Sequence, residues 1–399
     1  MHTELRSTYK HLGIPYLPDV NGGKMRGYSM FSQTVNRAEN VREDAARAYY
    51  YPFASRPNLS VMLNTTGNRI VWANQTGNFG PAVASGVEVT LSDGTIETIT
   101  ANKEVILSAG PLISPAILER SGVCNPELLA QHSIPLVINL TTVGENLQDQ
   151  INTEFIYTSN VSYTGQGTYL GHPTAYDIFG SITTNVANDV KNNLANYAAK
   201  VSAASNGTMS AANVLSLFKI QYDIIFENPT PIAEVLVTPK GTNFYTEYWG
   251  LLRFARGNVH IASTDPLQQP TINPNYMMLG WDMQEQIGSG KFIRRLFNTA
   301  PVSEHTTGES TPGYTTLPTG ATDTQWASWI NSASRANFHL VGTAAMMPRD
   351  MGGVVDTKLM SMVCGHSMST LYAVAERAAD LIKTGNYGAL VMQAGQGYI

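Results

Sequence analysis

Two histidines, His339 and His366, have the side chain best suited to proton transfer, and both stand among small and apolar residues. Imidazole has an unperturbed pKa of about 6.5, so it gives or takes a proton near neutral pH. Two imidazoles that face one cavity act as general base and general acid. A single histidine in an apolar segment is more often a core residue, so the assignment depends on the surrounding sequence. We take His339 as the candidate base and His366 as the candidate acid or hydrogen-bond donor.

The residues around both histidines resemble a known family. Residues 339–348 read HLVGTAAMMP and residues 352–356 read GGVVD. Together they resemble the C-terminal signature of the glucose-methanol-choline (GMC) oxidoreductases, especially the glucose oxidase branch. Residues 366–373, HSMSTLYA, resemble the segment that carries the second active-site histidine of this family. The resemblance implies that His339 and His366 face a substrate together.

The same resemblance implies two domains in a mixed α/β (α+β) fold. Residues 109–124 and 143–150 (VGENLQDQ) resemble segments that border the flavin in the family, although Pro111 and Cys124 replace small residues. Residues 1–150 and 336–399 are therefore expected to be a truncated remnant of the FAD-binding domain. Residues 151–335 are expected to form the substrate-binding lobe, an antiparallel sheet with helices on one side. His260, between Val259 and Ile261, is interpreted as the exposed face of a strand.

Periodicity and turn residues predict the individual elements. A short amphipathic helix opens the chain, and residues 105–107 read as a strand that is buried on both faces. Further helices are predicted at 41–50, from 114 to about 122, and at 189–204, 211–226 and 369–383. Further strands are predicted at 60–63, 69–72, 86–91, 95–100, 234–237 and 248–254.

Composition limits the partners. The 399 residues include 14% charged residues and carry a formal net charge of -5, so nucleic acid is not an expected partner. No apolar run approaches the roughly 20 residues that a membrane span needs. The N-terminus shows no secretory signal, which favours the cytoplasm. The two cysteines, Cys124 and Cys364, form no cluster at metal-ligand spacing, so no metal site is predicted.

A dinucleotide site is the feature that the sequence lacks. Such a site needs a glycine-rich turn between a buried strand and a helix. Residues 165–171 (GQGTYLG) have the wrong spacing, and residues 288–291 (GSGK) sit inside a helical pattern. Between residues 355 and 366 the chain also lacks a strand that touches the flavin in the family. We therefore predict that no cofactor is bound.

Without a flavin, side chains supply acids and bases but no place for a hydride. The leading hypothesis is a flavin-free enzyme that performs isomerase, cyclase, dehydratase or lyase chemistry on a small, planar or apolar metabolite. The alternative is the C-terminal part of a FAD-dependent GMC alcohol or sugar oxidoreductase, whose nucleotide-binding portion is missing or comes from another chain. A third is a binding protein without catalysis. Because lost strands leave open sheet edges, we expect a homo-oligomer.

Overall fold

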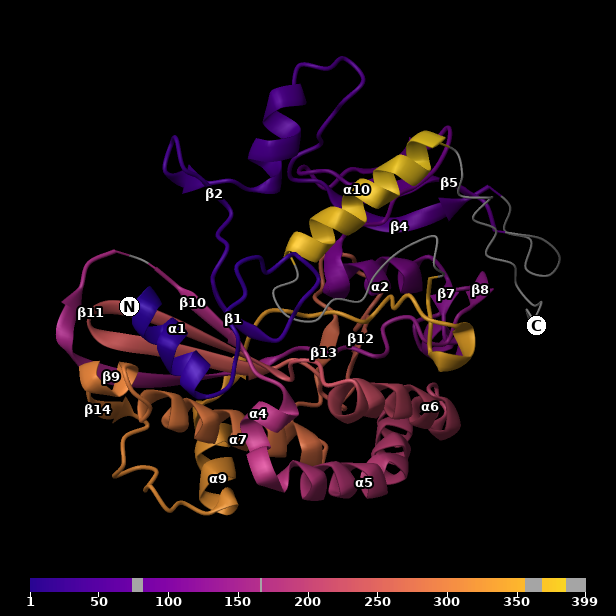
Figure 1. The fold of residues 1–399 in the computed structure, drawn as a ribbon. Coiled ribbons are helices and arrows are strands. Elements are labelled where there is room, and N and C mark those ends of the chain that lie inside the picture. The colour runs from indigo at the N-terminus through magenta and orange to yellow at the C-terminus, as the bar shows by residue number, and fades with distance from the viewer. Residues whose placement is uncertain (74–81, 166, 356–367, 385–399) are drawn as a thin grey trace.

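The computed structural model describes residues 1–73, 82–165, 167–355 and 368–384. Helices and largely antiparallel strands form a mixed α/β fold, which confirms the predicted fold class. Figure 1 shows one large sheet with helices below it, and a smaller group of strands and helices above and beside it. No helix in the described ranges is long and apolar enough to cross a membrane.

The large sheet has the strand order β1-β10-β11-β9-β14, and β15 also pairs with β9. The pairings are antiparallel. Its strands are β1 (Gly27–Met30), β9 (Ile151–Tyr163), β10 (Tyr169–His172), β11 (Ala233–Gly250), β14 (Thr306–Thr311) and β15 (Arg335–Ala336). The predicted strands at 234–237 and 248–254 are thus largely parts of one continuous strand.

Alternation along β9 explains how this sheet joins the core. Thr153, Phe155 and Tyr157 are buried, whereas Glu154 and Ile156 between them are only partly covered. Successive side chains in a strand point to opposite faces, so one face of β9 packs inward. On this face the Tyr157 ring stacks on Phe297 with a centroid distance of 3.9 Å.

Helices complete the larger core, and each buries an apolar stripe against the sheet or a neighbouring helix. The N-terminal helix α1 joins it through Leu5 and Tyr9. The helices of this part are α1 (His2–His11), α4 (Ala175–Phe179), η3 (Gly180–Ile182), α5 (Thr183–Ala204), α6 (Ala211–Tyr222), η4 (Asp223–Glu227), α7 (Gly280–Phe297), α8 (Val302–His305) and α9 (Asp323–Ala333).

A smaller core lies among a three-stranded antiparallel sheet, β4-β5-β6, and the helix α2. Its elements are β4 (Thr66–Trp72), β5 (Ala84–Thr90), β6 (Ile96–Thr100), α2 (Gly110–Arg120), β7 (Val123–Cys124), α3 (Pro126–Gln131) and β8 (Ile138–Asn139). The remaining elements are β2 (Val35–Asn36), β3 (Val41–Arg42), η1 (Ala46–Tyr50), η2 (Tyr51–Phe53), β12 (Asn258–His260), β13 (Thr271–Asn273), η5 (Arg349–Met351) and α10 (Met368–Thr384). The presence of two cores is compatible with two domains, but the predicted boundaries stay a prediction.

The clearest correction concerns residues 105–107, which do not form the predicted strand. Ile106 is 64% exposed, and Val105 and Leu107 are only partly covered. A strand buried on both faces needs neighbouring strands and covering helices. No described strand pairs with this segment, so Ile106 stays at the surface, while Val105 and Leu107 pack partly against the smaller core.

Other local predictions are wrong, either as a whole or at their boundaries. Residues 60–63 form no strand, and the predicted helix at 41–50 is a short strand followed by the π-helical turn η1. Helix α2 begins at Gly110, before the predicted start at Ser114. Its first turn contains Pro111, which is well suited to that place because proline lacks the N–H that would be unpaired there.

Candidate functional site

His339 lies on a segment that runs antiparallel to the start of β9. The Val341 amide donates to the Gln148 carbonyl and the Gln148 amide donates to the Val341 carbonyl, both at 2.9 Å. The Asn337 amide donates to the Gln150 carbonyl at 3.0 Å. Between these contacts, the His339 amide donates to Asp149 Oδ1 at 2.9 Å. The backbone of the candidate base is therefore fixed against the large sheet.

Backbone conformation on both sides of His339 sets the direction of its side chain. Phe338 has a positive φ of 59°, and its side chain is 81% exposed. Gly342 has a φ of 99°, a region that favours glycine. A Cβ atom at Gly342 would collide with the Asn146 carbonyl oxygen. The segment thus bulges locally, with Phe338 turned outward and His339 held by Asp149 and Gln150.

Carboxamide groups orient the His339 ring. Its Nδ1 atom lies 2.7 Å from Gln150 Oε1 and 2.9 Å from Asn337 Nδ2. A carboxamide oxygen only accepts, so the shorter contact places a proton on Nδ1. An Nδ1–H group opposite the Asn337 NH₂ would set two donors against each other, so we assign the hydrogen bond to Gln150. In that tautomer Nε2 is the basic nitrogen of the neutral ring.

A row of polar side chains continues from the histidine across the sheet. Asn337 Oδ1 accepts from Asn152 Nδ2 at 2.9 Å, and the same Nδ2 approaches Glu247 Oε1 at 3.3 Å. Arg335 forms an ion pair with Glu247. These groups come from β9, β11 and β15, so three strands present donors and acceptors beside one imidazole. Such a surface is suited to a substrate that carries hydroxyl groups.

The indole of Trp249 forms an apolar neighbour of this row. Trp249 is 2% exposed, and its ring meets the His339 ring edge to face at a centroid distance of 5.9 Å. Sequence analysis did not single out Trp249, Arg335 or Glu247. Glu247 and Trp249 lie on β11 and Arg335 lies on β15, and only the pairing of both strands with β9 brings them together.

The second predicted histidine, His366, lies outside the described residues, as does most of the stretch between residues 355 and 366. The structure therefore places His339 but does not test whether the two imidazoles face each other. Their pairing stays a prediction.

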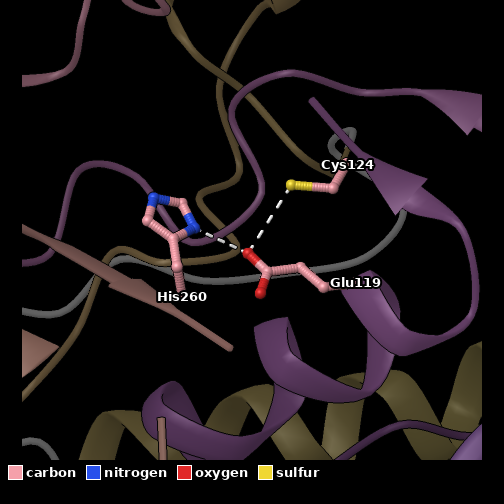
Figure 2. A group of neighbouring side chains, drawn as sticks. All are labelled: Glu119, Cys124 and His260. Atoms are coloured by element: carbon pink, nitrogen blue, oxygen red, sulfur yellow. Dashed lines mark hydrogen bonds and ion pairs between the residues drawn. The ribbon is translucent and has the colours of Figure 1, made fainter. Parts of the chain in front are cut away.

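A second polar cluster surrounds His260, and the sequence interpretation of this residue as an exposed strand face is wrong. Its side chain is 19% exposed, and both ring nitrogens meet carboxylates. Nδ1 lies 2.7 Å from Glu119 Oε1, and Nε2 lies 3.3 Å from Glu145 Oε1. Figure 2 shows Glu119 at the end of α2 between His260 and Cys124. The Cys124 Sγ atom is 3.5 Å from the same Glu119 oxygen.

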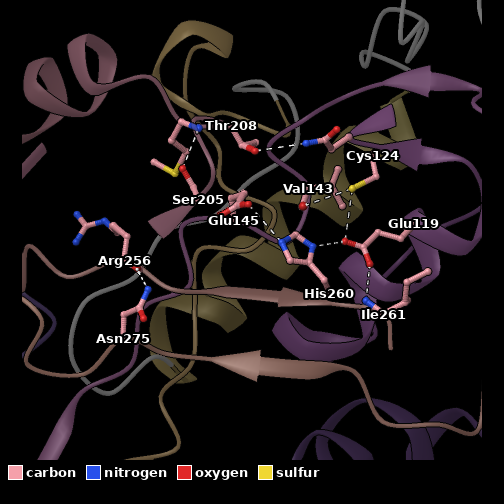
Figure 3. A network of polar contacts seen from close by, with 12 residues as sticks. Glu119, Cys124, Val143, Glu145, Ser205, Thr208, Arg256, His260, Ile261 and Asn275 are labelled. Carbon is pink, nitrogen blue, oxygen red and sulfur yellow. Dashed lines mark hydrogen bonds and ion pairs between the residues drawn. The ribbon is translucent and has the colours of Figure 1, made fainter. Parts of the chain in front are cut away.

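Burial and charge act in opposite directions on this histidine. Burial lowers the pKa of His260, but hydrogen bonds and charge from Glu119 and Glu145 raise it, with a net pKa of about 9. Burial also raises the pKa of the Cys124 thiol, and the Glu119 charge adds to that rise. Figure 3 shows how the cluster joins α2, the turn before β9 and the hairpin of β12 and β13.

Comparisons with known proteins identify the family. Residues 2–152 match the N-terminal model of the GMC oxidoreductases, and residues 254–375 match their C-terminal model. This chain belongs to the GMC oxidoreductase family. The resemblance read from the residues around His339 is confirmed at this level.

Two similar proteins carry glucose oxidase in their names. The glucose oxidase-like protein fsoC of Humicola fuscoatra is 38% identical over 393 residues, which cover 94% of this chain and 66% of that protein. The glucose oxidase of Aspergillus carbonarius is 30% identical, over 95% of this chain and 64% of that protein. The chain thus spans slightly less than two thirds of the length of these relatives.

Solved structures show the same fold. A FAD-dependent oxidoreductase from Chaetomium thermophilum superimposes with a TM-score of 0.83 at 24% identity, covering 96% of this chain and 72% of that one. These findings contradict the prediction that no cofactor is bound, because GMC relatives and neighbours of this kind depend on FAD. The flavin-free interpretation rested on missing motifs, which family membership outweighs.

The start of α2 is open and lies next to the His339 segment. Helix α2 starts without a side-chain cap, and space around Gly110 is open, since a Cβ atom there would meet nothing within 4 Å. Thr343 Oγ1 donates to the Pro111 carbonyl at 2.6 Å, which ties this helix start to the His339 segment. An open helix N-terminus attracts electron-rich groups. The α2 start lies within residues 109–124, which resemble a flavin-bordering segment of the family.

The nucleotide side of FAD is not matched by the described residues. Residues 165–171 lie in the connection from β9 to β10, and residues 288–291 lie inside α7. Neither forms a glycine-rich turn between a buried strand and a helix N-terminus. These two glycine-containing segments therefore provide no site for dinucleotide phosphates.

Proposed function

We propose that this chain is the substrate-binding and flavin-facing part of a FAD-dependent oxidoreductase that oxidises a hydroxyl group of a sugar or another small alcohol. The observation that carries the proposal is the imidazole of His339, held through Nδ1 by Gln150 beside Trp249. The GMC family membership and the relatives with glucose oxidase names support the redox chemistry.

In this proposal His339 acts as general base. With the proton on Nδ1, Nε2 accepts the hydroxyl proton of the substrate as the carbon is oxidised. FAD, when bound, supplies the acceptor for the hydride from that carbon. The contact with Gln150 also stabilises the imidazolium that forms, because a carboxamide oxygen continues to accept from Nδ1. General base catalysis contributes about 10²- to 10⁴-fold to turnover.

The polar row positions the substrate. The carboxylate of Glu247 accepts from substrate hydroxyls, and Arg335 and Asn152 donate to them. Trp249, which is 2% exposed, packs against the His339 ring and limits its movement. This division agrees with the predicted substrate lobe at residues 151–335 and a flavin-facing part made of residues 1–150 and 336–399.

The exposed apolar segment at residues 105–107 supports the same proposal. It precedes the α2 start, where the flavin ring is expected, and it lacks neighbouring strands among the described residues. We propose that a dinucleotide-binding α/β unit pairs with this segment and holds the nucleotide. That unit corresponds to the part of the Humicola fuscoatra protein that this chain does not match, or comes from another chain.

Reconstitution tests this function. The chain is co-expressed with the third of the Humicola fuscoatra protein that it does not match, and the purified complex is tested for a flavin absorption band and for alcohol oxidation with a dye acceptor. We expect both, with turnover lost in His339→Ala while the flavin band remains. A complex that holds FAD but oxidises no sugar or alcohol would refute the proposed reaction.

A further inference from the structure

The cluster around His260 contains three ligand types that proteins use for zinc. The carboxylate of Glu119, the thiol of Cys124 and the imidazole of His260 each offer one atom, and these atoms lie within 4.8 Å of one another. Glu119 and Cys124 are fully buried at 0% exposure. Surface acidic groups often gather without a ligand, but this buried set offers one sulfur, one nitrogen and one oxygen donor, all atom types that zinc binds.

The spacing is close to that of a tetrahedral site. Zinc binds sulfur at about 2.3 Å and nitrogen or oxygen at about 2.0–2.2 Å, so neighbouring ligand atoms are roughly 3.3–3.7 Å apart. Cys124 Sγ lies 3.5 Å from Glu119 Oε1 and 3.8 Å from the Val143 carbonyl oxygen. His260 Nδ1 lies 2.7 Å from Glu119 Oε1, so this one distance must lengthen by about 0.6 Å on binding.

Neighbouring groups hold each ligand in the required orientation. His260 presents Nδ1 to the cluster, while Nε2 meets the carboxylate of Glu145 at 3.3 Å. A carboxylate on the second nitrogen is the usual partner of a metal-bound histidine, because it fixes the ring and raises its basicity. Glu119 Oε2 accepts from the Ile261 amide at 2.7 Å, which leaves Oε1 directed at the sulfur and the imidazole. Figure 3 shows these contacts converging on one point.

We propose that Glu119, Cys124 and His260 bind a zinc ion, with the Val143 carbonyl or a water molecule beside the fourth position. The ion would join the end of α2 and β7 to β12, segments about 140 residues apart in the chain. Buried and enclosed by protein, this is a structural site. It is separate from the His339 site and does not depend on the proposed oxidoreductase activity.

Cobalt is the probe that tests this site. The metal-free purified chain is titrated with Co²⁺, and a thiolate-to-metal charge-transfer band reports binding to a cysteine. We expect one Co²⁺ per chain, displacement of the band by Zn²⁺, which binds such sites more tightly, and a higher Tm in the presence of Zn²⁺. Absence of the band in the wild-type protein at millimolar Co²⁺ would overturn the proposal, whatever the variants do.

Variants locate the ion. Cys124→Ser should abolish the band, whereas Cys364→Ser, which changes the other cysteine of the chain, should leave it. Glu145→Gln should keep the band but weaken the affinity about 10- to 100-fold, the usual effect of losing a carboxylate behind a histidine ligand. His172→Gln should leave the band unchanged and controls for a change in another histidine–carboxylate pair. His172 lies 3.7 Å from Glu234 and is remote from either cysteine in sequence. A band that survives Cys124→Ser and disappears in Cys364→Ser would place the metal elsewhere.

Discussion

Replacing Glu285 by glutamine should stabilise this protein at neutral pH. The reason is that the Glu285 carboxyl ionises in the unfolded chain but must be protonated to stay buried in the folded chain. Glu285 lies on α7 at 0% exposure against the bare backbone of Gly250. Neither carboxyl oxygen has a hydrogen-bond partner among the described residues. The nearby Leu251 amide already donates to the Ile232 carbonyl at 2.7 Å. Burial raises the pKa of Glu285 from 4.5 to about 8.

The free energy of unfolding falls as the pH rises, because Glu285 ionises more readily in the unfolded chain than in the folded one. Below pH 4.5 the carboxyl is protonated in both the folded and the unfolded chain, so it costs nothing. Between pH 4.5 and about 8 only the unfolded chain is ionised, and the free energy of unfolding falls by about 1.4 kcal/mol per pH unit. Above pH 8 the loss is constant at about 5 kcal/mol. At pH 7 the loss is about 3 kcal/mol.

Urea unfolding at pH 4, 5, 6, 7 and 8 measures this effect in the wild-type chain and in Glu285→Gln. The glutamine amide adds its own unpaired polar atoms, so its absolute stability is offset by about 1–3 kcal/mol at every pH. The difference between the two proteins should nevertheless grow steadily in favour of the variant as the pH rises. Glu97→Gln, on the exposed strand β6, controls for the loss of one charge. A difference that does not change with pH would refute the argument.

Three further predictions concern the site and the core. His339→Ala should lower turnover of the reconstituted enzyme about 10²- to 10⁴-fold, whereas His305→Gln should not; equal rates would remove the general base. Gly342→Ala should also lower turnover, because its Cβ atom would collide with the Asn146 carbonyl and displace the His339 segment. Gly320→Ala is the matched control for kinetics and circular dichroism, because Gly320 is exposed and has open space around it. Glu309→Gln should lower the free energy of unfolding by about 3–5 kcal/mol, since it leaves Arg294, 9% exposed and 2.6 Å from Glu309, without its charged partner; a loss under 1 kcal/mol in urea melts would contradict this.

Sequence patterns were sufficient where local periodicity or a contiguous motif carried the information. The helix α1, the meander of β4, β5 and β6, and the helices α5 and α6 lie near their predicted positions. The segment around His339 was found because its motif is contiguous. The family followed from the same residues.

Long-range pairing accounts for what the sequence did not predict. The cluster of Glu119, Cys124 and His260 has no spacing signature, because its members are brought together by β12 packing beside α2. The alternation around His260 suggested an exposed side chain, but both neighbouring carboxylates come from distant segments, Glu119 on α2 and Glu145 on the turn before β9. The prediction for residues 105–107 is wrong for the opposite reason: their apolar composition is typical of a buried strand, but no described strand pairs with them. The prediction that no cofactor is bound was wrong because it relied on the absence of a glycine-rich turn, whereas residues 2–152 and 254–375 match the GMC family models.

Anaerobic mixing of the reconstituted, flavin-containing protein with sugars and small alcohols tests the central claim most directly. We predict that an alcohol bleaches the flavin absorption band, and that His339→Ala slows the bleaching about 10²- to 10⁴-fold without changing the flavin content. A flavin band that no sugar or alcohol bleaches, or one that bleaches equally fast in His339→Ala, would contradict the proposed chemistry.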